Sequence, residues 1–206
     1  MNKAIFILAG IGILLFSSEG LAQRAERGAE SFKVCADCHG AQGEGNQAKG
    51  APKLAGQASW YLARQIKNFR DRIRGGSDVD ERGHTMSQIA ESLKSDQQIQ
   101  DLVAYIGTLP EQPPAHTIDG DVANGKALFA TCVGCHGAEG EGNVYKGAPV
   151  LAGMSDWYLL AQLRKFKSGV RGADMDDLHG GEMAPNAEAL ADEKSMRDVI
   201  AYIDTL

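Results

Sequence analysis

The feature that most constrains this sequence is an internal repeat with a spacing of 97 residues. Shifting the 206-residue chain by that distance places Cys35 on Cys132 and aligns the two halves without a gap. Other coinciding residues are Gly28 and Gly125, Phe32 and Phe129, Lys49–Pro52 and Lys146–Pro149, Leu54–Gly56 and Leu151–Gly153, Trp60–Leu62 and Trp157–Leu159, Met86 and Met183, and Tyr105–Ile106 and Tyr202–Ile203. Such self-similarity at a fixed period indicates one structural unit present twice.

The repeat and the composition of the intervening segments predict four parts. The two copies occupy residues 23–109 and 122–206, and residues 110–121 join them. This joining segment begins with Pro110 and contains Pro113 and Pro114 among polar residues, which is typical of a semi-rigid linker. Residues 1–22 precede the first copy and have a different character.

Residues 1–22 are predicted to be a cleaved secretory signal peptide. Lys3 is followed by an apolar run from Ala4 to Phe16, and small residues lead to a cleavage site after Ala22. The alternative is an uncleaved membrane anchor, but the run is shorter than the roughly 20 residues that a spanning helix needs. We therefore expect export to the periplasm.

The periodicity within each copy is helical, so we expect an all-α fold. Apolar residues share one face of a final helix in each copy, Ile99–Leu109 and Met196–Leu206. Ser95 with Gln98 predicts a capping box at the start of the first, and Asp192 predicts the N-cap of the second. Middle helices are expected over Ser59–Ile73 and Tyr158–Val170, and a short helix is expected at Gly28–Lys33 and at its counterpart in the second copy.

Each copy contains the motif Cys-x-x-Cys-His, at Cys35–His39 and at Cys132–His136. This is the attachment signature of c-type haem. Two thiols one helical turn apart can add to the two vinyl groups on one porphyrin edge, and the adjacent histidine then reaches the iron. The sequence thus predicts two covalently attached haem c groups, held by Cys35, Cys38, Cys132 and Cys135, with His39 and His136 as axial ligands.

Three other uses of these cysteines compete with haem attachment. A structural zinc site needs four ligands, and each copy offers one cysteine pair and one histidine, so zinc would have to join the two copies. A thioredoxin-like redox pair requires a βαβ context, which is absent from the pattern. Disulfides are common in exported proteins, but they would leave both histidines unexplained.

Met86 and Met183 are the expected second axial ligands. Each lies 47 residues beyond its motif histidine, in a polar, glycine-bearing stretch expected to be a loop. Methionine is more often a flexible core filler, yet these two are retained while their neighbours differ. His84 and His179 do not coincide in the repeat, so bis-histidine coordination would require two different sites. Methionine ligation raises the reduction potential of a haem.

The charge of the chain is divided unevenly. Residues 23–109 contain 12 Lys and Arg against 11 Asp and Glu, and residues 110–206 contain 8 against 15. Neither half is basic enough for nucleic-acid binding. The asymmetry bears on docking and encounter with protein partners.

With these residues in hand, the chain resembles the class I cytochromes c, and among them the dihaem cytochrome c4 group, over nearly the whole predicted mature chain. The resemblance implies that the Pro52 and Pro149 carbonyls accept the Nδ1 protons of His39 and His136. It implies that the domains face each other across a pseudo-two-fold axis, with the haem propionates between them. It also suggests that Trp60, Tyr61 and Gln65, with Trp157, Tyr158 and Gln162, lie near the haem edge, although helix packing would equally account for them.

The expected function is that of an electron carrier and not of an enzyme. The protein would pass electrons from a quinol-oxidising complex or a dehydrogenase to a terminal oxidase or another acceptor, and would meet the membrane only through such partners. One alternative is a cytochrome subunit of a larger dehydrogenase, for example a flavin-containing sulfide dehydrogenase. Another is a dihaem peroxidase, which needs an iron with an open position, and matched methionines argue against it.

Overall fold

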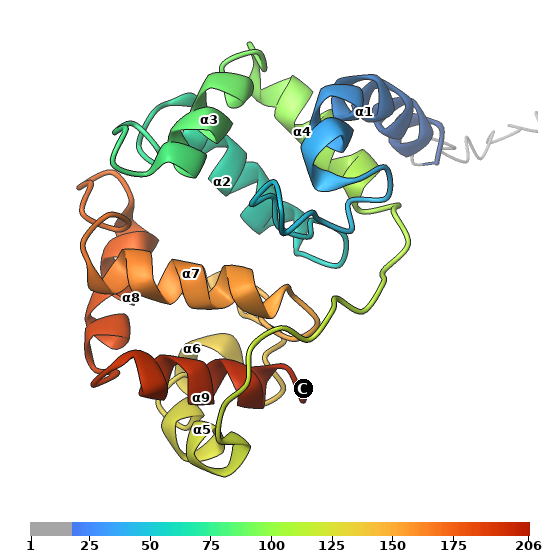
Figure 1. Ribbon diagram of the computed structural model, residues 1–206. Helices are drawn as coiled ribbons and strands as arrows, with labels where there is room; N and C mark the ends of the chain where they lie inside the picture. The colour runs from blue at the N-terminus through green and yellow to red at the C-terminus, as the bar shows by residue number, and fades with distance from the viewer. Residues whose placement is uncertain (1–17) are drawn as a thin grey trace, which may run out of the picture.

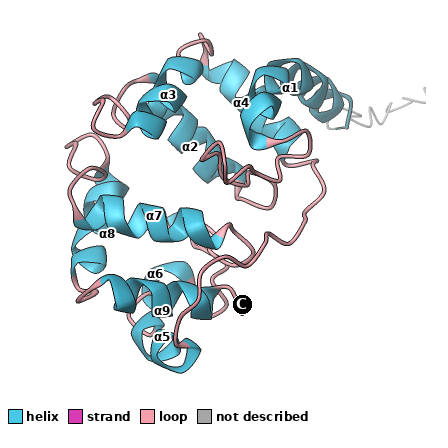
Figure 2. Ribbon diagram, in the orientation of Figure 1, coloured by secondary structure: helices cyan, strands magenta, loops and turns pink. Residues whose placement is uncertain are grey.

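The computed structural model describes residues 18–206, which form helices joined by loops (Figure 2). Within these residues there is no strand, only isolated bridges pairing Asn46 with Ala51 and Asn143 with Ala148. The helices are α1 (Ser18–His39), α2 (Ser59–Arg70), α3 (Glu81–Ala90), α4 (Asp96–Ile106), α5 (Val122–Phe129), α6 (Val133–His136), α7 (Asp156–Lys167), α8 (Leu178–Glu188) and α9 (Glu193–Ile203), with a 3₁₀ turn, η1, at Val144–Lys146. The expected all-α fold is confirmed.

The helices form two groups, which we call the first domain (α1–α4) and the second domain (α5–α9). Figure 1 shows them one above the other, with α2 and α7 facing each other across the boundary. Each domain has its own apolar core. The cores are Phe32, Leu62, Ile66, Leu93, Ile99, Leu102, Val103 and Ile106 in the first, and Ile118, Phe129, Leu160, Leu190, Met196, Val199, Ile200 and Ile203 in the second.

In both domains the first helix crosses the last at a glycine. A Cβ atom on Gly28 would lie 2.0 Å from the Asp101 carbonyl oxygen, and one on Gly125 would lie 1.9 Å from that of Asp198. Only glycine allows two helix backbones to approach so closely. The crossing is completed by an aromatic pair, Phe32–Tyr105 or Phe129–Tyr202, with ring centroids 5.3 and 5.4 Å apart.

The last helix of each domain begins as the sequence predicts. Ser95 accepts a hydrogen bond from the Gln98 N–H, and the Gln98 side chain accepts one from the Ser95 N–H, so the capping box is confirmed. Asp192 accepts from the Ser195 N–H at the start of α9. These bonds satisfy backbone donors that a helix leaves free at its N-terminus.

Other helix boundaries differ from the prediction. Helix α1 is much longer than the expected Gly28–Lys33 segment and runs into the first Cys-x-x-Cys-His motif, whereas the second domain divides the same region into α5 and α6. Helices α2 and α7 end at Arg70 and Lys167, a few residues early. Most of the predicted signal peptide, residues 1–17, lies outside the described residues, and residues 18–22 form the start of α1.

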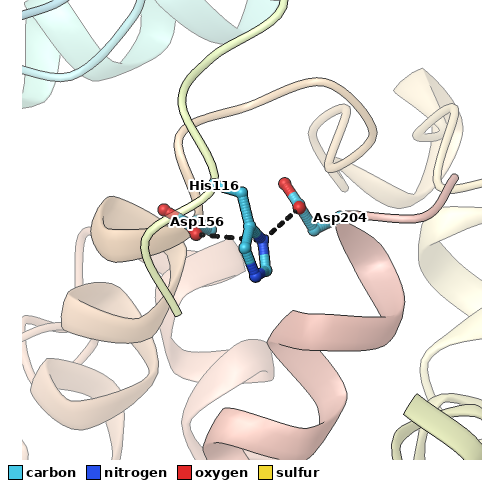
Figure 3. A group of neighbouring side chains, drawn as sticks. All are labelled: His116, Asp156 and Asp204. Carbon is cyan, nitrogen blue, oxygen red and sulfur yellow. Dashed lines mark hydrogen bonds and ion pairs between the residues drawn. The ribbon is translucent and has the colours of Figure 1, made fainter. Parts of the chain in front are cut away.

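The linker is anchored to the second domain by a buried carboxylate. Asp156, at the start of α7, accepts hydrogen bonds from the Thr117 N–H and hydroxyl and from the Ile118 N–H at 2.5, 2.7 and 2.8 Å. His116 lies between this group and Asp204, with its Nδ1 2.6 Å from an Asp204 oxygen and 3.8 Å from an Asp156 oxygen (Figure 3). Although burial alone would raise the pKa of Asp156, the Thr117 and Ile118 donors lower it, which keeps the anchor ionised.

Candidate functional site

The four motif cysteines line a cavity that extends through both domains. Cys35 and Cys38 lie in the last turns of α1, and Cys132 and Cys135 lie at the start and within α6. All four are free thiols, so none of the disulfides considered above is present. Burial raises the pKa of the Cys35 thiol to about 11 and also raises that of Cys132.

Each motif histidine is buried and held in one orientation by a proline carbonyl. The Nδ1 of His39 lies 2.7 Å from the Pro52 oxygen, and that of His136 lies 3.0 Å from the Pro149 oxygen. Because a carbonyl can only accept, Nδ1 must carry the proton, which leaves the Nε2 lone pair free to bind a metal. Burial lowers the pKa of both histidines, partly offset by these bonds, and so favours the neutral form that ligates. The contacts implied by the family resemblance are therefore confirmed.

Met86 and Met183 line the same cavity, and both are half-buried. They lie on helices α3 and α8, so the expectation of a loop was wrong. Asp80 and Asp177 cap these helices by accepting hydrogen bonds from the N–H groups of Gly83 and Gly180. Of the alternative histidines, His179 lines the cavity and His84 does not. Among the candidate second ligands, the methionines are thus the matched pair that both domains present to the cavity.

The cavity suits a flat apolar group that also carries anionic substituents. Leu62, Ile66 and Leu102 are among its walls in the first domain, and Leu163 and Ile200 are among them in the second. Arg74 and Arg171 line it where the domains meet, and both are buried. The Nε of Arg171 has no hydrogen-bond partner among residues 18–206. A haem combines an apolar macrocycle with two carboxylates, so these residues fit it.

The two arginines also join the domains through a symmetric hydrogen-bond network. Each guanidinium donates three bonds of 2.7 to 3.0 Å and reaches both domains. Arg74 donates to Gln65, Tyr158 and Gln162, and Arg171 donates to Gln162, Tyr61 and Gln65. Every member has its counterpart 97 residues away, so the network has pseudo-two-fold symmetry.

Two further contacts lie across the boundary at matched positions. Lys165 on α7 pairs with Asp80 at 2.6 Å, and Asn68 on α2 donates to Asp177 at 3.3 Å. Burial alone would raise the pKa of Asp80, but the hydrogen bonds from Lys165 and from the Gly83 N–H lower it. The same aspartates that cap the methionine-bearing helices α3 and α8 thus also contact the opposite domain.

Part of this interface consists of residues that the sequence already indicated. Tyr61 and Gln65, which the family resemblance suggested near the haem edge, line the cavity and accept hydrogen bonds from Arg171 of the second domain. Trp157 lines the cavity and Trp60 does not. The arginines were not singled out, although the coincidence of Arg74 with Arg171 in the repeat was a signal that could have found them.

Comparison with known proteins gives a consistent result. The family model described as Cytochrome c matches residues 25–110 and 122–206. The chain is 30% identical to cytochrome c4 of Azotobacter vinelandii over the full length of both chains. It is 32% identical to the thiosulfate dehydrogenase electron acceptor of Stutzerimonas stutzeri, over 87% of each chain. The crystal structure of reduced recombinant cytochrome c4 from Pseudomonas stutzeri superimposes with a TM-score of 0.67 and 28% identity, covering 88% of this chain and 98% of that one.

Each domain presents a cysteine pair, an oriented histidine and a methionine to the shared cavity, which agrees with these similarities over both halves of the chain. Two domains of this kind imply two covalently bound haem c groups and an electron-carrying role without catalysis. The chain belongs to the cytochrome c family and, within it, to the dihaem cytochrome c4 group.

Proposed function

We propose that this protein carries electrons in the periplasm between a quinol-oxidising complex or dehydrogenase and a terminal oxidase or other acceptor. In this proposal Cys35 and Cys38, and Cys132 and Cys135, form the thioether bonds. His39 with Met86 would ligate one iron, and His136 with Met183 would ligate the other. The observation that carries the proposal is that both domains present this set to one continuous cavity, with the Nδ1–H of each histidine donated to a proline carbonyl.

The chain's own contribution is to hold two ligands in place for each iron. A bound haem supplies an iron that changes between the ferrous and ferric states. Buried histidines with one fixed tautomer and methionines on capped helices need little rearrangement when that charge changes. Methionine ligation favours the ferrous state, so we expect relatively high reduction potentials.

The ligand assignment is tested by an optical redox titration of the holo-protein. Wild type should show two low-spin haems and the far-red band that marks methionine bound to ferric iron. Met86→Ala and Met183→Ala should each remove about half of this band, because each variant frees one of two irons. Met175→Ala is a matched control, since this side chain is 91% exposed. Survival of the full band in both ligand variants would contradict the assignment.

The choice of partners is tested by purification and kinetics. One relative is named as an electron acceptor of thiosulfate dehydrogenase, which favours a dehydrogenase of that class as donor here. A free carrier should elute at the size of a single chain and be reduced in repeated turnovers by substoichiometric dehydrogenase. Elution with a large partner from native extracts would instead favour the subunit alternative. Rapid carbon monoxide binding to one reduced haem would revive the peroxidase alternative.

Localisation rests on the amino-terminal pattern of residues 1–22. Among residues 18–206, no helix is both long enough and apolar enough to cross a membrane. Cell fractionation followed by mass spectrometry of the intact protein should find it in the periplasmic fraction, starting at Gln23. Recovery of the full-length chain in the membrane fraction would favour the anchor.

A further inference from the structure

The domain interface contains one asymmetric set of contacts beside the symmetric arginine network. Three side chains of the first domain donate hydrogen bonds to the backbone of segment 147–153 in the second. Lys53 donates to the Gly153 carbonyl at 2.8 Å, Gln57 to the Val150 carbonyl at 3.0 Å, and Arg64 to the Gly147 carbonyl at 2.5 Å. This segment contains Pro149, whose carbonyl holds His136.

The reverse contacts cannot form. Residues 97 positions after Lys53, Gln57 and Arg64 are Val150, Met154 and Ala161. None of these three side chains carries an N–H or O–H group. The first domain therefore contacts the histidine-holding segment of the second, and the side chains at the three matched positions of the second cannot return these contacts.

Gln57 makes the most informative of the three contacts because it bonds Val150 twice. Its Nε2 donates to the Val150 carbonyl, and its Oε1 accepts from the Val150 N–H at 3.2 Å. The Ala58 N–H also donates to Oε1, at 3.0 Å, which fixes the orientation of the side-chain amide. The side chain is half-buried at the domain boundary.

The Val150 N–H belongs to the same peptide group as the Pro149 carbonyl. A continuous chain of hydrogen bonds thus runs from His136 Nδ1–H to the Pro149 oxygen, through the peptide, and from the Val150 N–H to Gln57 Oε1. Bonds in such a chain polarise one another, so an acceptor at the N–H end strengthens the carbonyl as an acceptor at the other end. A stronger acceptor for the Nδ1 proton makes the imidazole a more basic ligand.

We propose that Gln57 of the first domain is a positioning residue for the second haem, which it tunes through the Pro149–Val150 peptide. A more basic His136 favours ferric iron, so Gln57 lowers the reduction potential of the second haem relative to what that domain would have alone. Met154 provides no such effect at the first haem. The inference rests on the proposed function in one respect, that His136 ligates the iron.

The test replaces Gln57 with the residue that stands at its counterpart. Gln57→Met removes both hydrogen bonds to Val150 without changing the charge, so the cations on Lys53 and Arg64 still act on both haems. We expect the midpoint potential of the second haem to rise and that of the first to stay. Gln42→Met is the matched control, because that exposed side chain makes no hydrogen bond to the described residues.

A second measurement reads the histidine directly. In the reduced, diamagnetic protein the Nδ1 protons of His39 and His136 should give separate NMR signals. Gln57→Met should move the His136 signal upfield and speed its exchange with solvent. Gln57→Glu keeps an oxygen facing the Val150 N–H, and a carboxylate oxygen is a stronger acceptor than an amide oxygen. This variant should therefore move the His136 signal downfield. His39 should be unaffected in both.

The outcomes separate this inference from the proposed function. If wild type lacks a histidine-ligated haem at the second motif, the proposed function itself fails. If wild type has both haems but Gln57→Met leaves the second potential unchanged, or neither variant moves the His136 proton signal, only the role of Gln57 is overturned. Shifts of the same sign in both variants, or equal shifts at His39, would also overturn it.

Discussion

At the scale of single residues, Gly28 and Gly125 show how little space the helix crossings leave. Both stand where a Cβ would overlap a carbonyl oxygen of the last helix, at 2.0 and 1.9 Å. The obstacle is backbone, which cannot turn aside as a long side chain can. The contact also explains why this glycine is present in both copies while many surface positions between the copies differ.

Gly125→Ala should therefore destabilise the second domain. Overpacking at a fixed backbone contact costs roughly 1–3 kcal/mol, which outweighs the roughly 0.5–1 kcal/mol gained by replacing a helical glycine with alanine. Urea unfolding of the holo-protein measures the change. Gly134→Ala is the control: outside its chain neighbours and its own helix backbone, no described atom lies within 4 Å of its Cβ position, and the first domain has Asp37 there. Equal stability of Gly125→Ala and wild type would contradict the crossing geometry.

The residues that the covalent motif and the repeat singled out are brought together by the fold. The cysteine pairs, both histidines and the two methionines all line one cavity, and their roles as haem ligands stay a prediction. Gln57 was not predicted as a functional residue, because its importance comes from a contact with Val150, 93 residues away, that no local pattern encodes. The repeat highlights residues that are identical in both copies. The contact with Val150 depends instead on a position where the copies differ, Gln57 in the first and Met154 in the second.

At the scale of elements, helices with an apolar face were predicted and helices without one were missed. The final helices have a continuous apolar face and side-chain caps, and the structure confirms both. Helices α3 and α8 contain glycines and few apolar residues, and α8 includes Pro185. They are stabilised by their Asp80 and Asp177 caps and by packing against α2 and α7. Such tertiary support cannot be found from periodicity.

The linker is an element whose attachment should depend on pH. A hydrogen bond from His116 to Asp204, aided by Asp156 and Asp119, raises the pKa of His116 above its ordinary value of 6.5. A raised pKa in the folded state stabilises the protein fully below the unfolded pKa, and this contribution is lost as the pH rises through the folded-state value. The linker should thus be held more firmly at pH 6 than at pH 9.

An NMR titration of the His116 ring tests this expectation. Wild type should titrate above pH 6.5, and Asp204→Asn should bring the midpoint down towards that value. Asp119→Asn serves as the control, because this carboxylate is 99% exposed and 3.8 Å from the ring, and should have a smaller effect. A midpoint at or below 6.5 in wild type would show that His116 is not paired in solution.

At the scale of the whole molecule, the buried arginine network should couple the unfolding of the two domains. Arg171→Lys keeps the charge but cannot replace a planar group that donates to Gln162, Tyr61 and Gln65 together. Leaving buried polar groups unpaired costs roughly 1–3 kcal/mol each. We expect a single urea transition in wild type to separate into two in the variant.

Arg72→Lys is the matched control for this prediction. Arg72 pairs with Glu91 on the surface, where both side chains are more than a third exposed. Exposed ion pairs contribute about 0–1 kcal/mol, so the control should keep the wild-type transition. Two separate transitions in wild type, or one in Arg171→Lys, would show that the network does not couple the domains.

The reciprocity of Arg74 and Arg171 has a consequence for how such a chain can arise. Each domain donates arginine hydrogen bonds to the other and accepts the equivalent bonds from it, so the two surfaces are self-complementary. A two-fold homodimer requires an interface of this form. Two separate one-haem chains could meet in this way before any fusion. Covalent joining would then serve to keep one half at high effective concentration beside the other, and would free the halves to diverge, as Gln57 and Met154 have.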